Sequence, residues 1–263
     1  MKQINKTNNN ENKFKYPIHS VENAFSLLEA LADKGLELGI AEICKKIVLP
    51  KGTIHRLLGT LKNLGYIEQN PRNRKYYLTV KIFKLGTAVT DKVGLVQIIP
   101  YMKELSQQFN ETVNLAILDR DEITYLYSVG SDNTLKLDLR IGSHQPAYCA
   151  AGGKVLLAYL SEQELDGYLQ RVKLESYTPY TITSKEYLKK DLKLIRERGY
   201  SFVNEEYMQG VSCVAVPLKD QQGKVCAGLS FSVPTVRMDK EKLPQLIDSL
   251  ISTAKKITIP GFF

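Results

Sequence analysis

The chain has 263 residues, of which 43% are hydrophobic and 24% are charged, and its formal net charge is +8. This length suits two domains of ordinary size, and the apolar content is sufficient for packed cores. No apolar run approaches the roughly 20 residues that span a bilayer, and the N-terminus lacks the apolar segment of a signal peptide, so no membrane partner and a cytoplasmic location are expected.

The positive charge is unevenly distributed along the chain. Residues 1–90 carry 15 Lys and Arg against 7 Asp and Glu, whereas residues 91–263 carry 21 of each sign. This asymmetry indicates a basic module that meets a polyanion, joined to a neutral module with another task. A lysine-rich, solvated surface would give the same count, so the motifs have to decide.

The four cysteines and three histidines do not have the spacing of a metal site. No CxxC pair occurs, and the histidines lie far from the cysteines in most cases. We therefore expect reduced thiols, and neither a metal nor another cofactor.

The first 80 residues have the pattern of a small DNA-binding fold. Residues 1–17 are rich in Asn and Lys and predict a disordered arm. Apolar residues then recur at helical spacing in "SVENAFSLLEALA", "GIAEICKKIVLP" and "PKGTIHRLLGTLKN", and two β-rich segments bracket the turn "NPRNR". Three helices and a hairpin with a basic tip predict a winged helix-turn-helix over residues 18–80. The face of the first helix expected in the core carries Val21, Ala24, Phe25, Leu28 and Leu31.

The third helix, over residues 51–64, would lie in the DNA major groove. Its apolar seam leaves Gly52 and Gly59 on the opposite, outward side. A glycine costs a helix about 1 kcal/mol relative to alanine, so close approach of the backbone to DNA is one explanation and simple tolerance is the other. Arg56 is suited to reading guanine. The DNA-contacting residues expected on this helix and on the hairpin tip are Lys51, Thr53, His55, Arg56, Thr60, Arg72, Arg74 and Lys75.

The rest of the chain mixes helices and strands. Residues 81–99 predict a linker helix, Pro100 marks a new start, and residues 100–263 form the second domain. Expected strands are "TVNLAILD", "EITYLYSV", "LKLDL", "SCVAVPL" and "KVCAGLSFSV". Together they predict an α+β domain with a mainly antiparallel sheet.

Two of these strands have faces of different character. In "KVCAGLSFSV" bulky residues from Val225 to Val233 alternate with Cys226, Gly228, Ser230 and Ser232, and in "SCVAVPL" Cys213 and Ala215 oppose two valines. Small residues with hydroxyl groups can form the floor of a cavity. A sheet face covered by a helix would account for the same pattern.

No catalytic motif is evident. "AAGGKV" lacks the first glycine and the hydroxyl residue of a phosphate-binding loop. Cys149 and His144 could serve as a nucleophile and a base if their side chains met, but a separation of five residues gives no indication that they do. We expect a protein that is not an enzyme.

Several motifs together resemble the IclR family of bacterial transcriptional regulators. They are "LPKGTIHRLLGTLKNLGYIEQNP", "RIGSHQPAYCAAGGKVLLAYL" and "RGYSFVNEEYMQGVSCVAVPL", and the resemblance extends over nearly the whole chain from about residue 18. It implies an N-terminal winged helix-turn-helix, a linker helix that dimerises and a GAF-like effector domain.

The resemblance also implies partners and a ligand site. The partners are a palindromic double-stranded DNA operator, further copies of the chain in a dimer or tetramer, and a small carbon-source metabolite. We expect this metabolite to be an organic acid with an apolar portion, because Val203 stands where the family often has an aspartate. A second domain that only oligomerises is the alternative. The ligand residues implied by the family's motifs are Ala151, Gly152, Cys213, Ser230 and Ser232.

Overall fold

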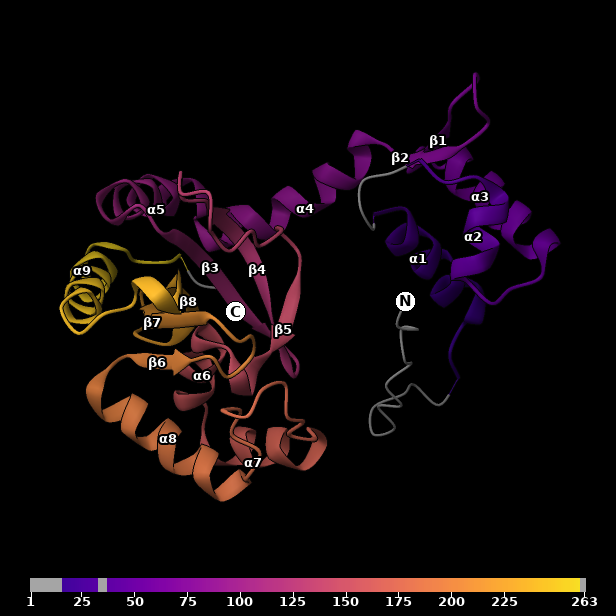
Figure 1. Ribbon diagram of the computed structural model, residues 1–263. Helices are drawn as coiled ribbons and strands as arrows, with labels where there is room; N and C mark the ends of the chain where they lie inside the picture. The colour runs from indigo at the N-terminus through magenta and orange to yellow at the C-terminus, as the bar shows by residue number, and fades with distance from the viewer. Residues whose placement is uncertain (1–15, 33–36, 261–263) are drawn as a thin grey trace. The chain divides into compact units, whose positions relative to one another are not determined.

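The computed structural model of the chain describes residues 16–32 and 37–260. The chain divides into two compact units, and the boundary falls between Val89 and Thr90, inside helix α4 (Figure 1). Most of the predicted N-terminal arm, residues 1–15, lies outside the described residues.

Unit 1 is the predicted winged helix-turn-helix. Its elements are α1 (His19–Ala32), α2 (Ile40–Lys46), α3 (Lys51–Asn63), β1 (Ile67–Gln69), β2 (Tyr76–Leu78) and the first part of α4 (Val80–Val93). β1 and β2 pair antiparallel, and an isolated bridge joins Leu38 to Tyr76. The apolar seam of α3 is buried at Ile54, Leu58 and Leu61, which confirms the helical spacing on which the prediction rested.

The buried face of α1 differs from the expected one. Leu27 and Leu31 lie in the core, whereas Val21 and Phe25 are exposed. The helix is therefore turned by about one residue relative to the predicted face, which leaves large apolar side chains at the surface of unit 1.

The segment after the hairpin is divided differently from the prediction. One helix was expected over residues 81–99, with a new start at Pro100. Instead α4 ends at Val93, Gly94 takes a left-handed conformation at φ 65°, and α5 (Leu95–Phe109) begins at once and continues through Pro100. A Cβ atom on Gly94 would also come within 2.9 Å of Pro260. Glycine is thus favoured at this break by its backbone angle and by its surroundings.

Unit 2 is an α+β domain with an antiparallel six-stranded sheet, as predicted. The strand order is β5-β4-β3-β8-β7-β6. The strands are β3 (Thr112–Asp119), β4 (Glu122–Val129), β5 (His144–Pro146), β6 (Ser201–Asn204), β7 (Val211–Lys219) and β8 (Val225–Pro234). The helices that follow α5 are η2 (Ala147–Cys149), α6 (Ala151–Ala158), α7 (Glu162–Arg171), α8 (Lys185–Arg198), η3 (Thr235–Arg237) and α9 (Lys242–Lys256).

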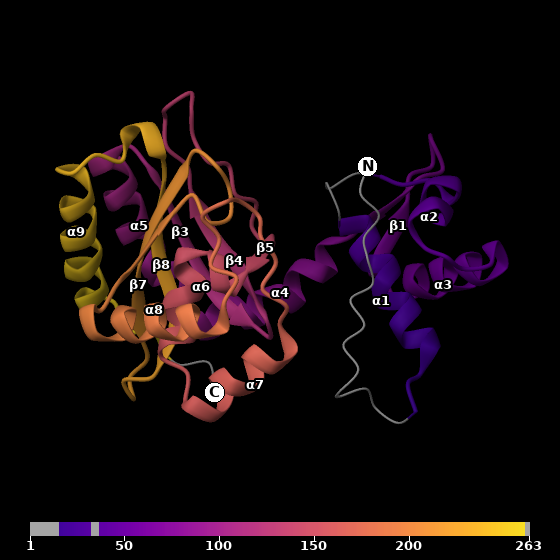
Figure 2. The same cartoon turned by 60° about the horizontal axis from the view of Figure 1, so that its bottom comes forward.

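Each face of the sheet has its own core. Helices α5 and α9 cover one face, and α6 and α8 cover the other (Figures 1 and 2). Leu229 and Phe231 of β8 point into the α5/α9 core, where Phe231 makes an edge-to-face contact with Phe109. The small residues of β8 face α6. The alternation predicted for β8 is therefore confirmed from Ala227 to Val233.

Three details of the sheet depart from the prediction. Residues 135–139, expected as a strand, have no strand conformation, and the short strands β5 and β6 were not predicted. A register shift next to Leu218 also reverses the faces at the start of β8, so that Val225 packs towards α6 and Cys226 towards the opposite core.

Glycines bring the first turn of α6 very close to its neighbours. A Cβ atom on Gly153 would lie 2.2 Å from the carbonyl oxygen of Ala147, and one on Gly228 would lie 3.1 Å from the backbone of Gly152. The start of α6 can therefore lie this close to Ala147 and to β8 only because Gly153 and Gly228 lack side chains.

We predict that Gly153→Ala lowers the melting temperature of the protein by many degrees, because the new methyl group overlaps a backbone carbonyl that cannot move away freely. Gly152→Ala is the matched control, since its methyl group would meet Ala116 at an ordinary 3.8 Å. Thermal unfolding of both variants tests this contact. Equal melting temperatures for the two variants would contradict it.

Candidate ligand pocket and DNA-binding surface

Helix α3 presents an exposed polar face. Lys51, His55 and Arg56 are exposed and, within the described part of the chain, have no ion-pair partner. Gly52 and Gly59 lie on this face too, and a Cβ atom on either would meet nothing within 4 Å. The predicted outward direction of both glycines is confirmed, so packing inside unit 1 does not explain them.

The two threonines of α3 lie at the edge of this face. Thr53 is half-buried, and Thr60 uses its hydroxyl hydrogen to donate to the carbonyl oxygen of Arg56 at 2.9 Å. Both line an apolar groove between α1 and α3 that also includes Phe25 and Leu57. Thr60 therefore retains only its acceptor capacity for DNA.

The hairpin is fastened to the helices by two carboxylates. Glu37 accepts hydrogen bonds from Asn70 at 2.9 Å and from Asn73 at 2.6 Å, and Lys75 pairs with Glu42 at 3.1 Å. The hydrogen bonds from Asn73 and Asn70 lower the pKa of Glu37, so its charge persists at neutral pH. Of the three cations predicted at the tip, Lys75 is occupied in this pairing, whereas Arg72 and Arg74 are exposed.

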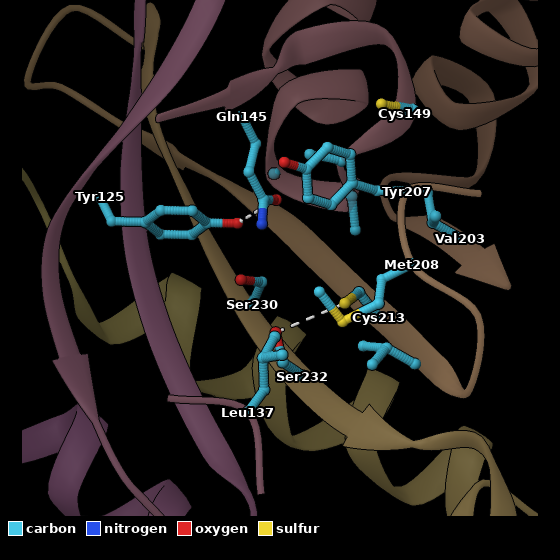
Figure 3. Close-up of a pocket in the computed structure, with 14 residues that line it drawn as sticks. Tyr125, Leu137, Gln145, Cys149, Val203, Tyr207, Met208, Cys213, Ser230 and Ser232 are labelled. Carbon is cyan, nitrogen blue, oxygen red and sulfur yellow. Dashed lines mark hydrogen bonds between the residues drawn. The ribbon is translucent and has the colours of Figure 1, made fainter. Parts of the chain in front are cut away.

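All five predicted ligand residues line one cavity in unit 2. Its volume is about 30 Å³. Figure 3 shows Tyr125, Gln145, Tyr207 and Met208 around Ser230 and Ser232. The lining residues are Tyr125, Leu137, Gln145, Cys149, Ala150, Ala151, Gly152, Val203, Tyr207, Met208, Val211, Cys213, Ser230 and Ser232.

The two serines of β8 have different surroundings. The oxygen of Ser232 accepts hydrogen bonds from Asn114 at 3.0 Å and from Cys213 at 3.4 Å. Ser230 is only 5% exposed, yet its hydroxyl group has no hydrogen-bond partner among the described residues. A hydroxyl group that opens into a cavity and has no protein partner is available to bind a ligand.

The start of α6 adds backbone donors to the same cavity. Ala150 precedes the helix and provides no side-chain cap, and in the described part of the chain the N–H groups of Ala151 and Gly152 have no protein acceptor. The first N–H groups of a helix carry the positive end of its dipole and bind anions. The cavity therefore combines unpaired backbone N–H donors with the hydroxyl group of Ser230.

A buried ion-pair cluster lies behind the cavity wall. Lys154 of α6 is fully buried and donates to Asp191 of α8 at 2.8 Å and to Glu206 at 2.5 Å. Burial raises the pKa of Glu206 although Lys154 opposes that effect. Glu206 belongs to the β6–β7 loop, which also carries Tyr207 and Met208 into the cavity wall. The cluster thus ties this loop to α6 and α8.

The cavity lining contains no charged side chain. Burial raises the pKa of Cys213 to about 11 and that of Cys149 to about 12, so both remain thiols at neutral pH. The Cys149 thiol donates to the carbonyl oxygen of Pro146 at 3.6 Å, and no hydrogen bond joins it to His144 among the described residues. This is the opposite of the environment that activates a cysteine nucleophile.

Comparison with known proteins identifies the family. Residues 20–71 match the IclR helix-turn-helix domain, and residues 87–259 match the family described as bacterial transcriptional regulator IclR C-terminal. The chain belongs to the IclR family.

Individual relatives support the same assignment. The HTH-type transcriptional regulator KdgR of Escherichia coli is 40% identical over 242 residues, which are 92% of each chain. The crystal structure of an IclR transcriptional regulator from Alicyclobacillus acidocaldarius has a TM-score of 0.81 at 28% identity and covers 94% of this chain and all of its own. The inducer-binding domain of the Acinetobacter regulator PobR, solved as a complex with 3-hydroxybenzoic acid, has a TM-score of 0.58 at 27% identity and covers 60% of this chain and 94% of its own.

For this IclR-family chain, sequence reasoning missed part of the pocket. Tyr125 and Gln145 come from β4 and β5, and Tyr207 and Met208 come from a loop. The alternation of β4 would place Tyr125 on the same face as Ile123, which is a usable signal. Gln145 lies in a three-residue edge strand with no periodicity to reveal it.

Within the described residues, no three His, Cys, Asp or Glu side chains gather as they would around a metal ion. The same residues include no helix with the length and apolar character needed to cross a membrane.

Proposed function

We propose that this transcriptional regulator binds a palindromic operator as a dimer or a dimer of dimers, and that a small organic acid bound in unit 2 changes its affinity for that operator. The observation that carries the proposal is the set of hydrogen-bond donors in the cavity that have no protein partner among the described residues, formed by Ser230 and the start of α6. Over the same residues, the other unit of the chain presents a basic helix face that also has no ion-pair partner.

On the DNA side, α3 supplies the base-reading group. Arg56 is exposed, unpaired and suited to the bidentate reading of guanine in the major groove. Arg72 and Arg74 on the hairpin are placed to contact phosphate, which contributes affinity without sequence preference. Lys75 contributes less than expected because Glu42 already neutralises it.

Dimerisation is supported by the apolar surface of unit 1. One groove brings together Phe25, which is 60% exposed, and Leu85, which is 59% exposed, with Val21 and Leu64, and a contiguous exposed apolar patch is typical of an interaction site. One basic module per chain, doubled by two-fold symmetry, fits an operator with two inverted half-sites.

The cavity suits a carboxylate. An anion would accept hydrogen bonds from Ala151, Gly152 and Ser230 without displacing any protein acceptor, and hydrogen bonds to a charged group are roughly twice as strong as neutral ones. Leu137, Val203 and Val211 give the remainder of the lining an apolar character. We therefore favour an acid with an apolar portion, and the Acinetobacter relative with its bound hydroxybenzoic acid is consistent with that class.

Binding requires the cavity wall to move. A volume of about 30 Å³ accommodates roughly two water molecules, which is less than a small acid occupies. Met208 lines the cavity and is 47% exposed, so its flexible side chain is the part of the wall most able to shift, while the Lys154 cluster holds the backbone of the loop. The opposite face of β8 packs on α5, the helix that follows α4. A movement of β8 would therefore act on the segment that leads to unit 1. The ligand acts through a different affinity for two arrangements of the dimer.

Arg56→Ala should weaken binding to the selected operator by about 1–3 kcal/mol and relax base preference, while Arg74→Ala should weaken binding to all sequences alike and reduce the salt slope by about one. The measurement is binding to operator and random DNA at several salt concentrations, with the operator obtained by selection from random sequences. Equal losses on both DNAs for Arg56→Ala would remove its base-reading role.

Gly59→Ala should stabilise the fold by up to about 1 kcal/mol, because alanine favours an exposed helix, and yet weaken operator binding, because the methyl group projects towards DNA. Gly86→Ala in α4 is the control, since that glycine is also exposed with nothing within 4 Å. Unchanged operator affinity in the stabilised Gly59 variant would favour simple tolerance of the glycine.

Ser230→Ala should leave the melting temperature nearly unchanged and reduce acid affinity about 10- to 100-fold, the loss expected for one hydrogen bond to a charged group. Ser232→Ala should instead destabilise the protein, because Asn114 loses its acceptor. The measurements are thermal shift with acetate, butyrate, benzoate and 4-hydroxybenzoate, followed by operator binding with any acid that stabilises the protein. A protein that no acid stabilises would favour a second domain that only oligomerises.

A further inference from the structure

One end of the cavity is formed by two polar side chains that are not among the expected ligand residues. Tyr125 of β4 and Gln145 of β5 reach into the cavity next to each other, and Ser230 lies below them (Figure 3). The Tyr125 hydroxyl donates to Gln145 Oε1 at 2.8 Å.

Tyr125 is held rigidly. Its side chain is 5% exposed, its N–H group donates to Ser143 at 3.0 Å, and its carbonyl oxygen accepts from Gly142 at 2.8 Å. Burial raises the pKa of Tyr125 well above its usual value, so the hydroxyl group keeps its proton and remains a donor. Gln145 turns its amide oxygen Oε1 towards this hydroxyl group.

This pairing determines where the amide nitrogen of Gln145 points. With Oε1 occupied by Tyr125, Nε2 lies on the other branch of the amide, and it has no acceptor among the residues that the structure describes. Gln145 is half-buried in the cavity wall. Two N–H bonds of a half-buried amide therefore lack a protein partner close to the unpaired hydroxyl of Ser230 (Figure 3), so a ligand in the cavity can accept hydrogen bonds from both groups.

We infer that Gln145, oriented by Tyr125, is a specificity-determining residue that donates its Nε2 hydrogens to an oxygen of the bound acid. This inference rests on the proposed function. It restricts the ligand class further: this end of the cavity offers donors and no carboxylate, so it accepts oxygen-rich acceptors such as carboxylates and keto acids and disfavours ligands that present an ammonium group, such as amino acids.

Gln145→Glu tests the inference with little change of shape. Tyr125 can still donate to one oxygen of the new carboxylate, so folding is preserved, but the other branch changes from a donor to a charged acceptor. Gln163→Glu, an exposed position on α7, is the control for the same change of charge. Tyr125→Phe removes the hydrogen bond that orients the amide of Gln145 and leaves the amide group itself unchanged.

The probes are benzoate and 4-hydroxybenzoate, each compared with its uncharged amide on the full-length chain at neutral pH, with affinity from calorimetry and stability from thermal unfolding. We expect Gln145→Glu to bind the acid at least 10-fold more weakly and to shift its preference towards the amide, which can donate to the new carboxylate. Tyr125→Phe should lose less, and Gln163→Glu should match the unaltered chain.

Two results would overturn the inference for different reasons. If Gln145→Glu keeps the melting temperature and the acid-to-amide preference of the unaltered chain, Gln145 does not contact the ligand, although the organic acid site stands. If neither acid binds the unaltered chain, the proposed organic acid function fails for this class, and the role of Gln145 fails with it.

Discussion

The candidate ligand pocket depends on the close approach of helix α6 to the sheet. Gly228 of β8 faces the backbone of Gly152, and Gly153 fits against the carbonyl of Ala147 with no room for a Cβ atom. These contacts bring the first N–H groups of α6 to the small face of β8, where Ser230 and Ser232 follow Gly228 at intervals of two residues. A helix seated farther from the sheet would leave the serines and the amides in separate places.

The same helix holds the outer wall of the pocket. Lys154 joins Asp191 and Glu206 beneath the surface, and the hydroxyl groups of Thr178 and Thr181 bond to the carbonyl oxygens of Glu205 and Glu206. Burying three charges gains little net stability, because desolvation offsets the attraction, so such a cluster is better understood as a device that selects one position for the loop. It supports the residues next to Glu206, which touch the cavity.

How much of the structure the sequence predicts depends on periodicity. The seam of α3 and the alternation of β7 and β8 identified both the winged helix and the small face of the pocket. Residues 135–139 alternate in the same way but form no strand, and their carbonyl oxygens at Leu135 and Leu137 accept from Arg237 and Thr112. Such side-chain contacts, which include the Tyr125–Gln145 hydrogen bond and the ion pairs of Lys154, join distant segments and leave no periodic pattern in the sequence.

The absence of charged groups from the described pocket lining has a consequence for how the protein would respond to acidity. The thiols of Cys149 and Cys213 have pKa values raised to about 12 and about 11, and burial also raises the pKa of Tyr125 and Tyr207. None of these groups changes its protonation between about pH 5 and pH 9, since each folded pKa is raised above that interval. The pocket lining therefore keeps one protonation state across that interval. Any dependence of sensing on the pH of the cell must come from the ionisation of the effector or from groups outside the lining, such as Glu206, whose pKa burial raises.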